Sequence, residues 1–176
     1  RSGTTWSQQA KLVSSDAGAG DFFGCSVVID GDTLVVGAYG QRGPYYQFSN
    51  TGAAYVFTRS GTSWSQQAKL QASDLQDNDQ FGGIVVIEGD TVVAAARLED
   101  TGGSQSGAVY VFTRSGTSWS QQAKVVASDA AAGDRFGQYV AIDSDTLVVG
   151  ADGENSYAGA VYVFTRSGTS WSQQAK

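Results

Sequence analysis

The apolar residues fall in short runs that recur three times along the chain. The first run of each unit reads CSVVI, GIVVI or QYVAI, at residues 25–29, 83–87 and 138–142. These runs are too short for a helix and rich in β-branched residues, so they predict strands. A second apolar run follows in each unit, at residues 33–38, 91–96 and 146–151. The turn between the two runs reads DGDT or EGDT in the first two units, which is typical of a tight hairpin in which Gly takes a positive φ.

Two more runs complete each unit. An aromatic run, GAAYVFTR or GAVYVFTR, stands at residues 52–59, 107–114 and 159–166. After a Ser-Gly-Thr turn, a polar run ending in WSQQAK stands at residues 63–69, 118–124 and 170–176. Each unit therefore predicts a four-stranded antiparallel meander. A further copy of the polar run at residues 2–11 predicts an extra outer strand, which makes thirteen strands in all.

The alternation inside the aromatic run indicates how the meanders pack. Tyr110 and Phe112 point to one face of the sheet, and Val109 and Val111 point to the other. Both faces are apolar, so both must be covered, and face-to-face stacking of successive sheets covers them. The sequence therefore predicts an all-β fold of three tandem four-stranded blades of a β-propeller, either an incomplete ring or a section of a longer array.

The repeat also predicts the limits of the units. Residues 1–11 are expected to form an outer strand of a preceding or neighbouring blade, and the three blades are expected at 12–69, 70–124 and 125–176. Closed propellers hold about four to eight blades, so three leave two sheet faces to be covered. We expect further blades of a longer array to cover them, or self-association in which chains dock head to tail.

Composition excludes several classes of function. The net charge is −6 and Lys and Arg form no run, which argues against nucleic acid as a partner. No apolar stretch is long enough to insert into a membrane. The chain has no His, which excludes Ser-His-Asp, Cys-His and zinc-hydrolase chemistry and predicts that the protein is not an enzyme.

The segments FGCSVVIDGDTLVVGA, RFGQYVAIDSDTLVVGA and GAVYVFTRSGTSWSQQAK resemble the bacterial FG-GAP repeat, which is related to the blades of the integrin α-subunit propeller. The resemblance implies a secreted or cell-surface module for adhesion, recognition or self-assembly. The residues that recur in every unit are interpreted as structural, namely Phe23, Gly24, Phe81, Gly82, Phe136, Gly137, Trp64, Trp119 and Trp171.

Integrin-type blades carry an Asp-x-Asp-x-Asp-Gly calcium loop between their first two strands, because calcium needs several converging oxygens. Here that connection is reduced to Asp-Gly-Asp or similar triplets, so no cofactor is expected there. Another acidic pattern precedes each Phe-Gly pair. In the second unit it supplies Asp74, Asp77 and Asp79 as candidate calcium ligands. The alternative is that these carboxylates cap the amides of their turn.

The connection between the second and third strands differs most between units, and such insertions often carry the binding face of a repeat protein. It supplies the candidate ligand- or partner-binding residues Arg42, Tyr45, Tyr46, Phe48, Arg97 and Glu99. The alternative function is a carbohydrate- or calcium-binding, lectin-like or enzymatic domain whose site crosses blades. In that case the exposed faces of the Trp residues would stack on sugars; the competing role for each Trp is to cover the edge of the neighbouring blade.

Overall fold

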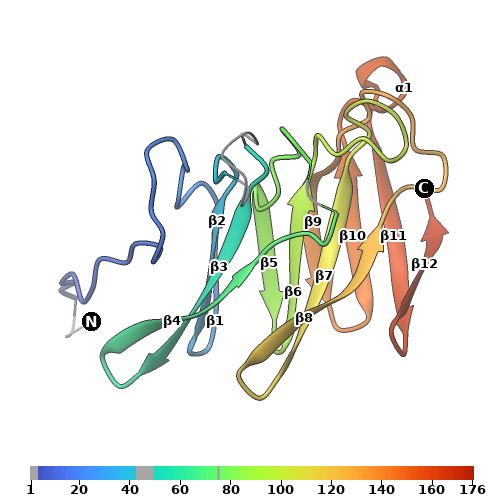
Figure 1. The fold of residues 1–176 in the computed structure, drawn as a ribbon. Coiled ribbons are helices and arrows are strands. Elements are labelled where there is room, and N and C mark those ends of the chain that lie inside the picture. The colour runs from blue at the N-terminus through green and yellow to red at the C-terminus, as the bar shows by residue number, and fades with distance from the viewer. Residues whose placement is uncertain (1–3, 43–49, 75) are drawn as a thin grey trace.

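The structure is a computed structural model that describes residues 4–42, 50–74 and 76–176. These residues form three four-stranded antiparallel sheets in which the strands pair in chain order (Figure 1). Sheet 1 contains β1 (Val27–Asp30), β2 (Thr33–Ala38), β3 (Ala53–Ser60) and β4 (Ser63–Leu70). Sheet 2 contains β5 (Ile84–Glu88), β6 (Thr91–Ala96), β7 (Ala108–Ser115) and β8 (Ser118–Val125). Sheet 3 contains β9 (Phe136–Asp143), β10 (Thr146–Ala151), β11 (Ala160–Ser167) and β12 (Ser170–Ala175), with a short helical turn α1 (Glu154–Tyr157) between β10 and β11.

The three sheets stand next to one another in chain order, with sheet 2 in the middle (Figure 1). The first strands β1, β5 and β9 are neighbours along one edge of the stack, and the fourth strands lie at the other edge. Sheets 1 and 3 lie at opposite ends of the stack, so the described residues do not close a ring. This arrangement confirms the prediction of three propeller blades.

The middle sheet is buried on both faces, as its residue pattern predicts. Tyr110 and Phe112 pack in an apolar cluster with residues of sheet 1. Val109 and Val111 lie in a second cluster, which they share with residues of sheet 3. Because successive side chains of a strand point to opposite faces, β7 contributes to both clusters at once. Sheet 2 therefore holds the two outer sheets together.

Each Phe-Gly pair places its Phe beneath the aromatic residues of its own sheet. The ring of Phe81 meets Tyr110 and Phe112 edge to face, with centroids 5.6 and 5.9 Å apart. Phe136 repeats this geometry in sheet 3, at 5.5 and 5.8 Å from its two aromatic neighbours. Both Phe side chains are completely buried. Edge-to-face contacts add to the free energy gained by burying such large rings.

The turns agree with the sequence, but the N-terminal strand does not form. Gly31 and Gly89 take the positive φ expected of a tight hairpin, and Ser144 takes it in the third copy, with φ of 55°. The extra outer strand predicted at residues 2–11 is absent from the described residues 4–11. A strand of this polarity needs the third strand of a preceding sheet to pair with, and the three sheets of the described residues do not include one at that place. The described residues thus form twelve strands.

Candidate functional site

Neighbouring sheets are joined at their outer edge by a contact that repeats once per junction. The indole N–H of Trp119 donates to the side-chain oxygen of Gln67 in the preceding outer strand, at 2.8 Å. Trp171 does the same to Gln122 at 3.3 Å, and Trp64 to Gln9 at 3.4 Å. Residues around Gln9 therefore occupy the place of a preceding outer strand, although they are not paired as one. These contacts favour the structural role of the Trp residues over a sugar-binding platform.

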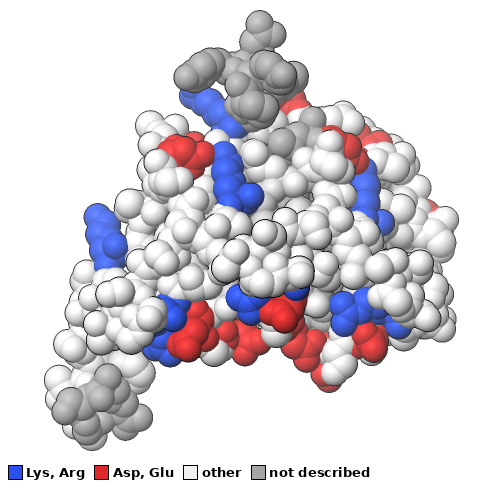
Figure 2. All heavy atoms as spheres, turned by 60° about the horizontal axis from the view of Figure 1, so that its bottom comes forward, with Lys and Arg blue, Asp and Glu red and all other residues white. Residues whose placement is uncertain are grey.

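The hairpin turns of neighbouring sheets are also joined. The backbone N–H of Gly89 donates to the carboxylate of Asp30 at 2.7 Å, and Arg114 donates to the hydroxyl of Thr33 at 3.0 Å. The junction of sheets 2 and 3 repeats both contacts, from Ser144 to Glu88 and from Arg166 to Thr91. Each Arg also pairs with an Asp of its own sheet, and basic and acidic side chains accordingly alternate along this edge (Figure 2).

A third repeated contact seats the Phe-Gly pairs of the second and third units on the preceding sheet. The backbone N–H of Phe81 donates to the carbonyl of Thr51, and Phe136 donates in the same way to Ser106. The next residue of the receiving sheet is Gly52 or Gly107, where an added Cβ would lie only 2.0 or 2.1 Å from a Phe carbonyl oxygen. Only glycine fits so close an approach.

The equivalent glycine of sheet 3 has nothing seated on it. Gly159 has the same positive φ, 79°, but the nearest atom to an added Cβ lies 3.8 Å away and is the carbonyl oxygen of Ala151, at the end of β10 of the same sheet. Sheet 3 therefore has the glycine that receives a Phe-Gly pair at the inner junctions, but no Phe-Gly pair of the described residues is seated on it.

The two outward faces expose residues that are buried at the inner junctions. Val161 of β11 is 55% exposed, whereas Val109 at the same repeat position is 0% exposed. On sheet 1, Val27 and Ile29 are 63% and 58% exposed, whereas Val85 and Ile87 at the same positions are 3% and 9% exposed. We call the outward face of sheet 3 around Tyr139, Gly159 and Val161 the C-face, and that of sheet 1 around Phe23, Val27 and Ile29 the N-face.

The C-face and the N-face carry complementary polar groups. The C-face presents Asp143, Thr146 and the carbonyl of Ala158, which correspond to the acceptors of the inner junctions. The N-face presents the backbone N–H groups of Gly31 and Phe23 and the guanidinium of Arg59, which correspond to the donors. The two faces are thus the two halves of one junction, and together they form the candidate functional site.

The candidate calcium ligands are not gathered into a cation site. Asp74 accepts hydrogen bonds from Lys124 at 2.6 Å and from the hydroxyl of Tyr110 at 2.8 Å. Asp79 is buried and accepts from the backbone N–H of Gln76 at 2.9 Å. Within residues 4–42, 50–74 and 76–176, no three acidic, Cys or His side chains are grouped to hold a metal, the set of Asp74, Asp77 and Asp79 included. The contacts of Asp74 and Asp79 are those of ion-pair and turn-capping carboxylates.

Asp79 gives the protein a pH-dependent stability. Burial, followed by the charges of Glu99, Asp100 and Asp74, raises the pKa of Asp79 from 3.8 to about 6, against the opposing hydrogen bond from Gln76. The folded protein therefore holds a proton that the unfolded chain releases over this range, and the free energy of unfolding falls as the pH rises from 3.8 to about 6. We expect Asp79→Asn to remove this fall and to stabilise the protein at pH 7 by about 2 kcal/mol.

Urea unfolding at a series of pH values measures this effect. Asp134→Asn is the matched control, because Asp134 caps the same turn in the third unit through the backbone N–H of Ala131. This variant measures the change in the free energy of unfolding that results from the loss of a turn-capping carboxylate alone. A pH profile of Asp79→Asn that keeps the full slope of the wild-type protein would contradict the assignment.

The candidate partner-binding residues have different surroundings. Arg42 is exposed, whereas Tyr45, Tyr46 and Phe48 lie outside the described residues. Arg97 donates to Gln80 and Gln138. Glu99 does not present its carboxylate to a partner: it is 1% exposed, pairs with Lys124 at 2.8 Å and accepts the N–H of Thr101. Its place in a variable loop predicts a surface role, but its carboxylate is buried and is engaged by Lys124 and Thr101.

Three stacked four-stranded meanders with their first strands together define propeller blades. The family model for the FG-GAP repeat matches residues 6–57, 64–112 and 119–164, and the chain belongs to this family. Each match begins at a Trp of the polar segment, one strand before the sheet that it enters. No curated protein matches the chain in sequence at a significant level. In the part of the chain that the structure describes, no helix is long and apolar enough to cross a bilayer.

Proposed function

We propose that this propeller module is a non-catalytic assembly unit, in which the C-face of one chain receives the N-face of a second copy. One observation carries the proposal. The molecule forms the same junction between sheets twice, and its two outward faces are the two halves of a third such junction, each without its counterpart. A contact between different surfaces of identical chains is heterologous, so it extends head to tail into a ring or a filament.

The apolar and polar parts of the two faces both support this pairing. Pairing would bury the exposed apolar side chains of both faces, as the inner junctions bury the residues at the equivalent positions. These side chains are Val161 and Tyr139 on the C-face and Val27 and Ile29 on the N-face. The outer-strand position at the new junction can be filled by either of two nearly identical segments. These are residues 1–11 of one chain and residues 166–176 of the other. Exchange of these segments between chains would add main-chain hydrogen bonds.

The proposed setting is the cell surface or the secreted fraction, where the module would serve adhesion or recognition as part of an assembly. The charged residues that repeat in each unit support a non-catalytic role, because they are engaged in structural contacts. Arg114 pairs with Asp90 and Lys124 with Asp74, and both pairs have equivalents in the other two sheets.

Two single variants test the pairing. Val161→Asp places a charge on the C-face, and Ile29→Asp places one on the N-face. We expect the wild-type chain to form species larger than 18.3 kDa at micromolar concentration, and each variant alone to remain at 18.3 kDa. An equimolar mixture of the two variants retains one intact face on each partner, so it is expected to form a dimer of twice this mass. Light scattering coupled to size-exclusion chromatography measures these masses.

Thermal melting of each variant is the control for folding, and we expect both to fold because both substitutions lie at exposed positions. A wild-type chain that stays at 18.3 kDa across the concentration range would overturn the proposal. So would a Val161→Asp variant that assembles as the wild-type chain does.

A further inference from the structure

The three units can be compared position by position to find residues that do more than build the blade, because a residue with a role of its own need not recur in every copy. Several positions differ in chemical type between the copies, and three of these positions contribute residues to one place in the structure. They are the residue before Phe-Gly, the residue after it and the residue that follows the second strand. In chain order of the units these are Phe22, Gln80 and Arg135; Cys25, Gly83 and Gln138; and Tyr39, Arg97 and Asp152.

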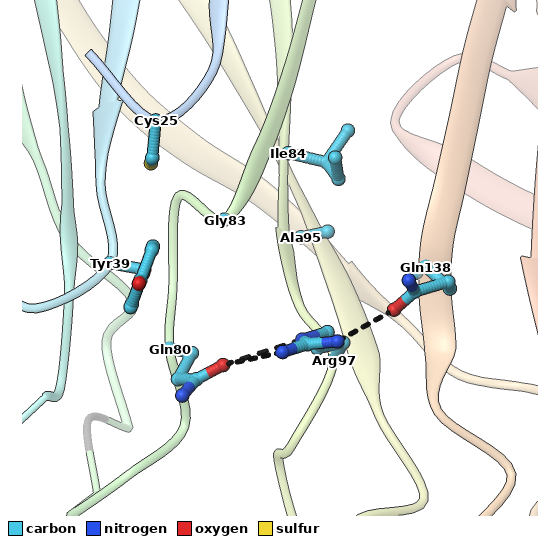
Figure 3. Close-up of a pocket in the computed structure, with 9 residues that line it drawn as sticks. Cys25, Tyr39, Gln80, Gly83, Ile84, Ala95, Arg97 and Gln138 are labelled. Atoms are coloured by element: carbon cyan, nitrogen blue, oxygen red, sulfur yellow. Dashed lines mark hydrogen bonds between the residues drawn. The ribbon is translucent and has the colours of Figure 1, made fainter. Parts of the chain in front are cut away.

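Residues from all three of these positions meet in one hollow of about 210 Å³. We call it the inner hollow; it lies where β1, β5 and β9 begin, and its lining includes Cys25, Tyr39, Gln80, Arg97 and Gln138. Figure 3 shows Arg97 between Gln80 and Gln138, with Cys25 and Tyr39 on the side of sheet 1. Three sheets therefore contribute to a single site, and they contribute their unlike residues to it.

Arg97 is held there by neutral groups. Its Nε and one terminal nitrogen donate to the side-chain oxygen of Gln80 at 3.3 and 3.2 Å, and the other terminal nitrogen donates to that of Gln138 at 3.0 Å. The repeated arginines Arg59, Arg114 and Arg166 each pair with an Asp instead. Among the ion pairs of the described residues, none includes Arg97. Its positive charge is thus fixed in direction but not neutralised by a carboxylate contact.

The hydrogen-bonding groups of the inner hollow are mainly donors. Three of the five N–H groups of Arg97 are used by the glutamine oxygens, which leaves two. Because both glutamine oxygens face Arg97, the amide NH₂ groups of Gln80 and Gln138 are free to donate elsewhere. The ring of Tyr39 stacks on Phe22, with centroids 4.8 Å apart and planes at 8°, and supplies a rigid apolar wall.

We propose that the inner hollow binds the carboxylate of a small ligand, with Arg97 as the charged contact and the amides of Gln80 and Gln138 as additional donors. A guanidinium with two free N–H groups matches the two oxygens of a carboxylate, and partial burial strengthens the contact. The volume suits a group of about the size of one sugar acid or one acidic side chain. This site is separate from the C-face and the N-face.

Titration calorimetry at low ionic strength tests the proposal with two acids and their neutral counterparts. D-glucuronate is compared with D-glucose, and N-acetylglutamate amide with N-acetylglutamine amide. We expect at least one acid to bind with a millimolar or lower Kd and its neutral counterpart to show no binding. The acid with the lower Kd identifies whether the carboxylate belongs to a saccharide or to a peptide side chain.

Three variants locate the binding. Gln138→Glu keeps an acceptor beside Arg97 but neutralises its charge, and Arg97→Gln removes the charge; each is expected to weaken binding at least about tenfold, the loss of one charged hydrogen bond. Arg135→Gln is the matched control, since Arg135 lies over the ring of Tyr157 at 5.6 Å and outside the inner hollow. It should leave the Kd unchanged. Absence of binding by both acids, equal binding of a neutral counterpart, or unchanged affinity in Gln138→Glu would each overturn the proposal.

Discussion

Replacement of Phe81 by alanine is expected to lower the free energy of unfolding by about 3–5 kcal/mol, the cost typical of removing a buried Phe ring. Phe81 is completely buried between sheets 1 and 2 and contacts Tyr110 and Phe112 edge to face. Its loss leaves a cavity in the cluster that joins the two sheets, and the packed strands around it have little freedom to close the cavity. Urea unfolding monitored by circular dichroism measures the change.

Two controls come from the first unit. Phe23 occupies the same repeat position but packs on the outward side of sheet 1, where it is only partly buried. Phe23→Ala is therefore expected to cost less than half as much. Phe22→Ala removes a ring that is 56% exposed and is expected to change stability little. Equal losses for Phe81→Ala and Phe23→Ala would show that the inner junction is not more tightly packed than the open face.

Lys124→Met is expected to lower the free energy of unfolding by about 3 kcal/mol, because removing one partner leaves a buried charge uncompensated. The ammonium group of Lys124 lies 2.8 Å from a carboxylate oxygen of Glu99, which is 1% exposed. It also contacts Asp74 and the hydroxyl of Thr101. Without this ammonium group, Glu99 keeps only the hydrogen bonds from Thr101.

Lys69→Met is the matched control for the second prediction. Lys69 holds the same position in sheet 1 and pairs with Asp16 at 2.7 Å, where both side chains are partly exposed and neither is buried as Glu99 is. Such an exposed pair contributes about 0–1 kcal/mol. Adding Glu99→Gln to Lys124→Met should recover part of the lost stability, because the buried charge is then gone. Equal effects of Lys69→Met and Lys124→Met would contradict the role given to Glu99.

The stacking of the sheets could be predicted from the sequence because it is encoded in local patterns. The alternation of Tyr110 and Phe112 with Val109 and Val111 requires cover on both faces, and only neighbouring sheets supply it. The hairpins could also be predicted from local sequence. Their Asp-Gly turns need a positive φ, and few residues other than Gly take a positive φ easily. Repetition strengthened each of these predictions, because one pattern was present three times.

Features that depend on distant partners could not be predicted in this way. The segment 4–11 has the sequence of an outer strand but lacks a third strand to pair with, and pairing is a property of the neighbour. Glu99 is hydrophilic and lies in a variable loop, and nothing local indicates that Lys124 and Thr101 bury it. The grouping of Arg97 with Gln80 and Gln138 joins three unlike positions of the repeat, so the repeated pattern itself concealed it. A comparison of the units for positions that differ would have pointed to these residues.

Thiol labelling at one repeat position tests most directly whether the sheets lie face to face. In a Cys25→Ser background, Val109→Cys and Val161→Cys place one thiol on the same face of the same strand in sheet 2 or sheet 3. We expect the thiol at position 161 to react rapidly in dilute native protein, and the thiol at position 109 to react only when the protein unfolds. Rapid native labelling at both positions would show that the middle sheet is not covered, and would contradict the stacked arrangement.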